Sequence, residues 1–123
     1  MSAVSQVINK QVLEATSGLA STSIGKELFT VANLLEVESR LRRNLADSGL
    51  TTEVRANLVK EIFGSRVSTE AVAVVQKIAG ARWFKDAALV EAIESAGALV
   101  VLAATEKDKA IDRVEEEIFF FAR

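Results

Sequence analysis

Residues 86–106 have the sequence DAALVEAIESAGALVVLAATE, and this stretch decides the fold of the chain. Its centre, Ala96–Ala104, is an unbroken apolar run, which is typical of a buried strand as well as of a buried helix. Leu89 and Ile93 before the run, and Glu106 after it, continue a period of about 3.6 residues. We therefore expect one long helix over these residues, buried on nearly all sides.

The rest of the chain repeats this period between residues that cap or end helices. Serine and threonine side chains favour helix N-caps, and glycine favours the turns after helices. The charged segment Glu36–Ser39 indicates a bend, and no proline interrupts any helix. The expected elements are a helix over 2–16 ended by Gly18, a helix through Ile24, Leu28 and Leu35 capped within Ser21–Ser23, a short helix through Leu41 and Leu45 ended at Asp47–Gly49, a helix over 52–63 capped by Thr51, a helix over 68–82 capped by Ser68, and a last segment over 108–122.

These elements predict an all-α fold, a compact six-helix bundle with an additional C-terminal helical segment. A chain of 123 residues suffices for one domain with a core of its own. The chain ends on Ile118–Arg123, which holds large apolar residues and no C-cap. This ending indicates a fragment of a longer protein.

The composition excludes most enzymatic chemistry. The chain has no histidine and no cysteine, so it lacks the usual general base near neutral pH, the thiolate nucleophile and the common zinc ligands. Its six glycines stand apart, so it encodes no glycine-rich phosphate loop. On a helix, the consecutive carboxylates of Glu115–Glu117 would point about 100° apart and would not converge on a metal ion. We therefore expect no catalytic, cofactor-binding or metal-binding residues, and no enzymatic activity.

Charge and hydropathy bound the partners and the location. The formal net charge of −2 gives no reason to expect nucleic acid or an anionic membrane as a partner. The N-terminal residues do not form a signal peptide, and the longest apolar run has about half the length of a membrane span. We therefore expect a soluble protein with no membrane insertion. Gly64–Val67 joins two helices by a turn that suits a helix-turn-helix, although 71–79 lacks a polar face for reading bases.

The apolar helix over 71–79 also suggests a binding surface. The first helix is similar, because Lys10 and Glu14 are its only charged residues. Two weakly charged helices favour a shared apolar groove that seats the amphipathic helix of a partner. Ordinary burial of both helices in the core is the alternative. The residues themselves thus leave two functions open, a helical adaptor domain and, less favoured, a helix-turn-helix that binds DNA.

Five segments, in order along the chain, carry a recognisable pattern. They are ELFTVANLL (Glu27–Leu35), LRRNL (Leu41–Leu45), IFGSRVS (Ile62–Ser68), ARW (Ala81–Trp83) and VEEEIF (Val114–Phe119) with Phe121 and Arg123. Together they resemble the delta subunit of bacterial F-type ATP synthase, whose mitochondrial counterpart is the oligomycin sensitivity-conferring protein. None of the segments is a catalytic signature. The first helix departs from the family, because Ser5–Lys10 lacks its tyrosine–alanine pattern.

The resemblance implies the N-terminal domain of delta, a six-helix bundle on the catalytic head of the synthase. In that family, N-terminal helices of the alpha subunits bind between the first and fifth helices, and a C-terminal domain joins the b subunits of the peripheral stalk. Residues 1–107 would then bind the head, and residues 108–123 would begin a connection to a C-terminal domain absent from this chain. Carried over to this chain, the groove residues are Val4, Val7, Ile8, Gln11, Val72, Val75, Gln76 and Ala79.

The resemblance also implies a function and a location. It implies a non-catalytic stator subunit that links the alpha subunits to the peripheral stalk during proton-driven ATP synthesis. Such a subunit is peripheral, at the cytoplasmic face of the bacterial plasma membrane, and needs no cofactor.

Overall fold

Serine and threonine side chains begin three of the helices, as the sequence predicted. A computed structural model describes the backbone of residues 10–121 and the side chains of residues 10–117. In this structure Ser21, Thr51 and Ser68 each accept a hydrogen bond, at 3.2 Å, from the backbone N–H three residues later. These bonds satisfy N–H groups that have no partner within their helix, and so they set where each helix begins.

No strand occurs among residues 10–121, so the predicted all-α fold is confirmed. Residues 10–15 are helical, and Gly18, with a φ of +78°, turns the chain after them in the left-handed region that glycine favours. The predicted bend lies at Glu38. The further helices are α2 (Thr22–Val37), α3 (Ser39–Leu45), α4 (Thr52–Phe63), α5 (Thr69–Ala79) and α6 (Asp86–Phe121).

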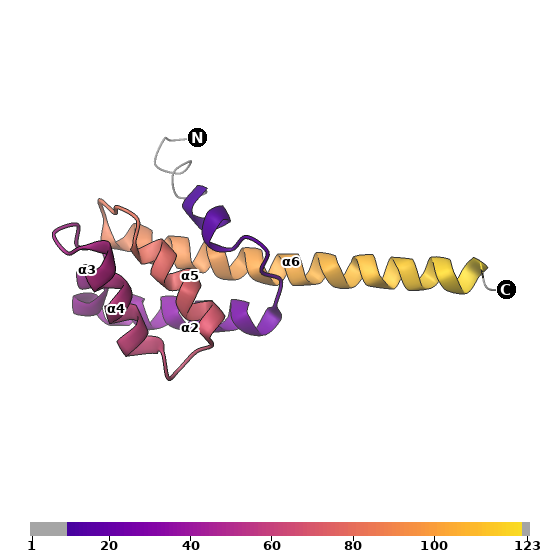
Figure 1. The fold of residues 1–123 in the computed structure, drawn as a ribbon, viewed down its shortest axis with the longest axis horizontal. Coiled ribbons are helices and arrows are strands. Elements are labelled where there is room, and N and C mark those ends of the chain that lie inside the picture. The colour runs from indigo at the N-terminus through magenta and orange to yellow at the C-terminus, as the bar shows by residue number, and fades with distance from the viewer. Residues whose placement is uncertain (1–9, 122–123) are drawn as a thin grey trace.

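The packing of α2 along α6 organises the bundle (Figure 1). Gly25 of α2 lies directly against α6, where a Cβ atom on it would overlap the side chain of Val101 and lie 2.9 Å from the carbonyl oxygen of Gly97. Glycine at this crossing therefore lets the two helix backbones approach closely. The α4 and α5 helices pack against each other, and α5 also contacts both α2 and α6.

The core lies where α2, α5 and α6 meet, and it is mainly aliphatic. Burying one large apolar side chain stabilises a fold by about 1.5–3 kcal/mol. Several such side chains have almost no exposed surface, namely Phe63, Leu28, Leu35, Leu45, Ile78, Leu89 and Ile93. The bundle therefore has a hydrophobic core that needs no disulfide to hold it together.

Two buried polar side chains hold the C-terminal end of α5. Arg55 of α4, only 5% exposed, donates from Nη1 to the carbonyl oxygens of Ala79 and Ala81. Trp83 donates from Nε1 to the carbonyl oxygen of Ile78 at 2.8 Å. Carbonyls at the end of a helix lack their usual partners four residues on, so these bonds fix where α5 ends. The prediction that this helix extends to residue 82 was therefore wrong.

The α6 helix is continuous from Asp86 to Phe121, so the predicted end near Glu106 and the separate segment 108–122 were wrong. No glycine or proline occurs after Gly97, and nothing else in this stretch ends a helix. Every side chain over residues 105–117 is exposed, because α6 extends beyond the bundle there (Figure 1). The prediction of burial on nearly all sides was wrong as well, since Leu102 is 54% exposed.

The hydropathy of α6 bears on the expected absence of a membrane span. By length and composition alone, Asp86–Glu117 is long and apolar enough to cross a membrane, which the short run Ala96–Ala104 did not suggest. The core helix of a soluble protein passes the same test, and 44% of the most apolar window of α6 is buried inside the bundle. The packing of α6 on α2 accounts for that buried part, and the absence of membrane insertion stays a prediction.

Candidate partner-binding groove

A hollow of about 520 Å³ opens on the surface between the helical residues 10–15 and the α5 helix. We call this hollow the groove. It is lined by Gln11, Glu14, Ala15, Thr52, Ala73, Gln76, Lys77, Gly80 and Ala81. It therefore lies between the first and fifth helical segments, the pair that the sequence predicted to form a binding surface.

The groove exists because α5 turns one face to the core and the opposite face outward. Its apolar residues Val72, Val75 and Ile78 are buried, as is Ala79 at its end. The residues that line the groove are three or four positions apart, so they lie together on the opposite face of the helix. They are Ala73, Gln76, Lys77 and Gly80.

The other wall is anchored to the core by its own apolar residues. Val12 and Ala15 are buried, while Gln11 and Glu14 on the same helical turn line the groove. The hydroxyl of Thr16 donates to the carbonyl oxygen of Val12 at 2.8 Å, which closes this short helix. The wall is therefore held by packing on one side and presents polar side chains to the groove on the other.

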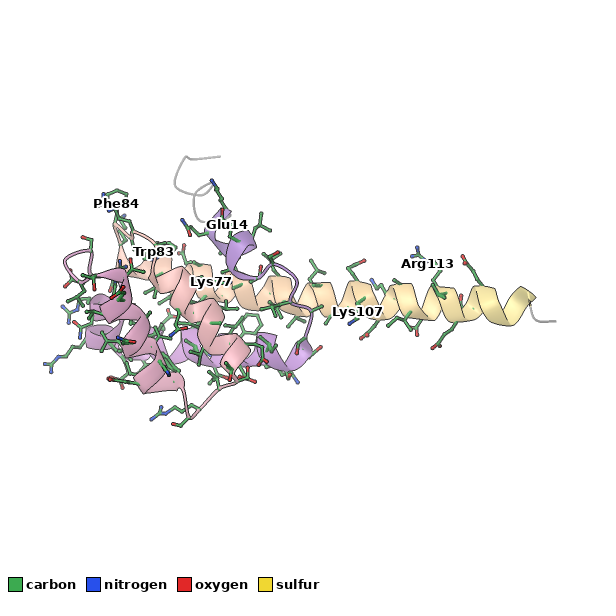
Figure 2. All side chains as sticks on the ribbon, in the orientation of Figure 1. Glu14, Lys77, Trp83, Phe84, Lys107 and Arg113 are labelled. Carbon is green, nitrogen blue, oxygen red and sulfur yellow. The ribbon has the colours of Figure 1, made fainter. Side chains whose placement is uncertain are left out.

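The groove combines a floor of small residues with a polar rim. Ala15 and Ala73 have short side chains, so the backbone of a bound helix can come close to the floor. The rim carries one negative and one positive charge, on Glu14 and Lys77, which Figure 2 labels on the first helical segment and on α5. Gln76 is held in place because its Nε2 donates to the carbonyl oxygen of Ala56 at 3.0 Å. A floor of small residues with a polar rim is typical of a surface that seats a polypeptide helix.

The residues predicted for the site fall into three groups. Gln11 and Gln76 line the groove. Val72, Val75 and Ala79 belong to the core, and the latter two have no exposed surface. Val4, Val7 and Ile8 lie outside the residues that the structure describes.

On α5 the predicted residues and the residues that line the groove differ by one position. The prediction chose 72, 75, 76 and 79, whereas the groove is lined by 73, 76, 77 and 80. One residue corresponds to a rotation of about 100° around the helix axis. The prediction carried the valines over from the family as partner contacts, but the core of the bundle buries them. The signal that could have found the outward face is its stripe of small and polar residues, Ala73, Gln76, Lys77 and Gly80, on an otherwise apolar helix.

A separate polar contact joins α3 to the start of α6. Arg42 of α3 donates from Nε to a carboxylate oxygen of Asp86 at 2.7 Å and from Nη1 to the carbonyl oxygens of Leu35 and Glu36. This hydrogen bond, together with the positive charge of Arg42, lowers the pKa of the Asp86 carboxyl below its usual value of 3.8. Within residues 10–117, no group of three or more histidine, cysteine or acidic side chains gathers as metal ligands.

Comparison with known proteins shows which proteins this chain is similar to. No family model matches the chain. Its curated relatives include proteins named ATP synthase subunit delta from three bacteria. The protein of Rhodococcus opacus is 36% identical over 104 residues, which are 85% of this chain and 37% of that protein. The protein of Acidothermus cellulolyticus is 35% identical over 100 residues, 81% of this chain and 36% of that protein.

A third relative matches along the whole chain. The ATP synthase subunit delta of Kineococcus radiotolerans is 30% identical over 123 residues, which are 100% of this chain and 44% of that protein. The chain thus spans less than half the length of these relatives. The resemblance predicted from the five sequence segments is confirmed, and this chain is a homologue of ATP synthase subunit delta over most of its own length.

Proposed function

We propose that this chain acts as a non-catalytic stator component of an F-type ATP synthase. In this proposal the groove holds the amphipathic N-terminal helix of an alpha subunit of the catalytic head. The observation that carries the proposal is the open groove between the first and fifth helical segments, in a homologue of subunit delta. A connection beyond residue 107 would lead to a C-terminal domain that joins the b subunits of the peripheral stalk. The complex would place the chain, as a peripheral protein, at the cytoplasmic face of the plasma membrane.

The construction of the groove supports this role because a stator contact must be stiff. Both walls are fixed to the core, through Val12 and Ala15 on one side and Val72 and Val75 on the other. The end of α5 is held by the hydrogen bonds from Arg55 and Trp83. A site built on helices whose side chains are locked by packing is more rigid than a site on loops. Such a groove resists deformation when torque is applied to the bound helix.

The side chains on the outward face of α5 do not suit a DNA-binding helix-turn-helix. A recognition helix needs a polar face that reaches base edges in the major groove. The outward face of α5 offers Gln76 and Lys77, but Gln76 is already bonded to the carbonyl oxygen of Ala56. The small residues Ala73 and Gly80 between them suit a close helix–helix contact better than base contacts.

A binding experiment with a matched pair of variants tests the proposal. The probe is a peptide copied from the N-terminus of the alpha subunit of the same organism, measured by calorimetry. Ala73→Arg places a long side chain over the groove floor, and Ala98→Arg makes the same change at an exposed position of α6. We expect Ala73→Arg to weaken the affinity for the alpha peptide at least about tenfold, because substitutions at the centre of an interface have the largest effects. We expect Ala98→Arg to leave the affinity unchanged.

Two outcomes would contradict the proposal. If the wild-type chain does not bind the alpha peptide, the groove is not its site. If Ala73→Arg melts like the wild type and binds equally well, the peptide binds elsewhere. An unrelated amphipathic helix of equal length and charge serves as the control, and equal affinity for it would point to a general helical adaptor.

A further inference from the structure

The part of α6 beyond the bundle carries an apolar stripe that no described residue covers. Ile111 and Val114 are 46% and 52% exposed, and they are large apolar side chains on a helix that is surrounded by solvent. Together with Lys107, Ala110 and Glu115 they border an apolar hollow of about 310 Å³ on the helix surface. Figure 2 shows Lys107 and Arg113 on this projecting part of α6.

The stripe is a continuation of the core-facing side of α6. Val100 and Ala104 are buried inside the bundle. The same spacing, with alternating steps of four and three residues, continues through Lys107, Ile111 and Val114, and in the sequence through Ile118 and Phe121. Apolar residues that alternate in this way form the seam of a coiled coil, in which each side chain packs between those of a facing helix. Over residues 86–104 the bundle supplies the facing helices, and over residues 105–117 nothing in the described chain does.

The charges beside the seam show what kind of helix fits it. The positions that flank a coiled-coil seam set the choice of partner through salt bridges. Here Asp108 and Glu115 lie on one flank, and Ala110 and Glu117 lie on the other. The basic residues Lys109 and Arg113 occupy the back of the helix, away from the seam. Both flanks are therefore acidic or neutral, and the one positive charge in the exposed seam is Lys107.

A second copy of the chain fits this pattern poorly. In a parallel pair, Lys107 would face Lys107 of the other copy inside the seam. In an antiparallel pair, the flank that holds Asp108 and Glu115 would face the same flank of the other copy, so carboxylates would oppose carboxylates. Both arrangements place like charges together.

We propose that the projecting part of α6 docks an amphipathic helix of a separate protein. That helix has an apolar seam flanked by lysine or arginine residues, and it has a carboxylate at the position opposite Lys107. The basic flanks would pair with Asp108, Glu115 and Glu117, while the apolar seam covers Ile111 and Val114. This surface lies on α6, outside the groove, so its occupation does not depend on the function proposed for the groove.

A pair of synthetic helices tests the charge rule on the complete chain. Both peptides have about four heptads with isoleucine and leucine in the seam and one glutamate opposite Lys107. One peptide has lysine at all flanking positions and the other has glutamate there. We expect the lysine-flanked peptide to bind at least about tenfold more tightly, and its affinity to fall as salt is raised.

Two variants of the chain locate the site. Ile111→Asp puts a charge into the seam, and Thr105→Asp puts the same charge on the back of the same exposed stretch. We expect only Ile111→Asp to weaken peptide binding, by about tenfold or more, without changing the melting temperature or the affinity for the alpha peptide. Equal binding of the two peptides, no binding of either, or self-association of the chain that Ile111→Asp abolishes would each overturn the proposal.

Discussion

The crossing of α2 and α6 offers a sharp test of how the bundle is held together. Gly25→Ala adds one Cβ atom where the two helices are closest. That atom would overlap the Val101 side chain and lie 2.9 Å from the carbonyl oxygen of Gly97. A valine in a helix keeps essentially one rotamer, so the Val101 side chain cannot easily turn away, and the backbone oxygen can move only if the helices separate. We therefore expect the variant to be less stable than the wild type, although alanine is the better helix former.

The magnitude follows from two opposing effects. Overpacking a well-filled contact costs about 1–3 kcal/mol. Replacing glycine by alanine inside a helix recovers about 0.5–1 kcal/mol. From the middle of each range, about 2 kcal/mol lost and about 0.75 kcal/mol recovered, the net loss for Gly25→Ala is about 1 kcal/mol in the free energy of unfolding.

Gly97→Ala is the matched control on the opposite helix. Its Cβ atom would lie 3.1 Å from the carbonyl oxygen of Gly25 and 3.3 Å from the ring of Phe29, so these neighbours must give by a few tenths of an ångström, much less than the overlap with Val101 demands at Gly25. The gain in helix propensity then offsets the cost, and we expect a stability within about 0.5 kcal/mol of the wild type. Ser95→Ala, at an exposed position of α6, calibrates the propensity gain without any new contact.

Urea unfolding followed by circular dichroism measures all three variants. For a chain of this size, about 1 kcal/mol corresponds to roughly 3–5 °C in melting temperature, so thermal melts provide an independent check. A Gly25→Ala variant as stable as Gly97→Ala would refute the reasoning, because it would show that α2 and α6 are not in close backbone contact at Gly25.

Three further predictions concern individual side chains. Val75→Ala removes two buried carbon atoms from a side chain with no exposed surface, and we expect it to lower the free energy of unfolding by about 2–3 kcal/mol in urea titrations. The control is Val114→Ala, at an exposed position, which should lower it by less than about 0.5 kcal/mol. Trp83→Phe removes the indole donor to the carbonyl oxygen of Ile78 and should cost about 1–2 kcal/mol, measured in the same way. A neutral result would mean that the backbone N–H of Ala81, which donates to the same oxygen at 3.1 Å, is sufficient. Asp86→Asn should lower the melting temperature at pH 7, and this difference should shrink as the pH is lowered into the acid range. Arg42 lowers the pKa of the Asp86 carboxyl below 3.8, so the stabilisation from its charge is fully present above 3.8 and is lost as the pH falls through the lowered pKa. A difference in melting temperature that stays constant from pH 7 into acid would show that the charge of Asp86 is not what stabilises the junction of α3 and α6.

The helices and their starts followed from the sequence because the signals for them are local. Ser21, Thr51 and Ser68 cap the helices that they were predicted to cap, since a hydroxyl needs only the backbone N–H three residues later to do so. The assignment of Ala96–Ala104 to a helix was also correct, because the residues around it continue the helical period. The family resemblance was equally local, since it depended on five short segments in order.

The burial of Arg55 could not be predicted in this way. The continuation of α6 could have been, because the stretch after Glu106 contains no signal that ends a helix, and the predicted end near Glu106 relied on the apolar pattern alone. Arg55 looks like a surface residue in the sequence, yet it is buried, because the carbonyl oxygens of Ala79 and Ala81 reach it from a distant part of the chain. Contacts between residues so far apart leave no trace in local periodicity.

The groove shows the same division most clearly. The sequence by itself determined that an apolar helix follows Ser68 and that Ser68 caps it. That this helix forms a binding surface with the first helix stays a prediction. Only the tertiary structure decided that Val72 and Val75 point to the core and that Ala73 and Gln76 point to the groove. The physical reason is that the rotation of a helix about its own axis depends on what packs against it. When apolar side chains occur on several faces of a helix, its neighbours in the fold, and not its own sequence, choose which face is buried.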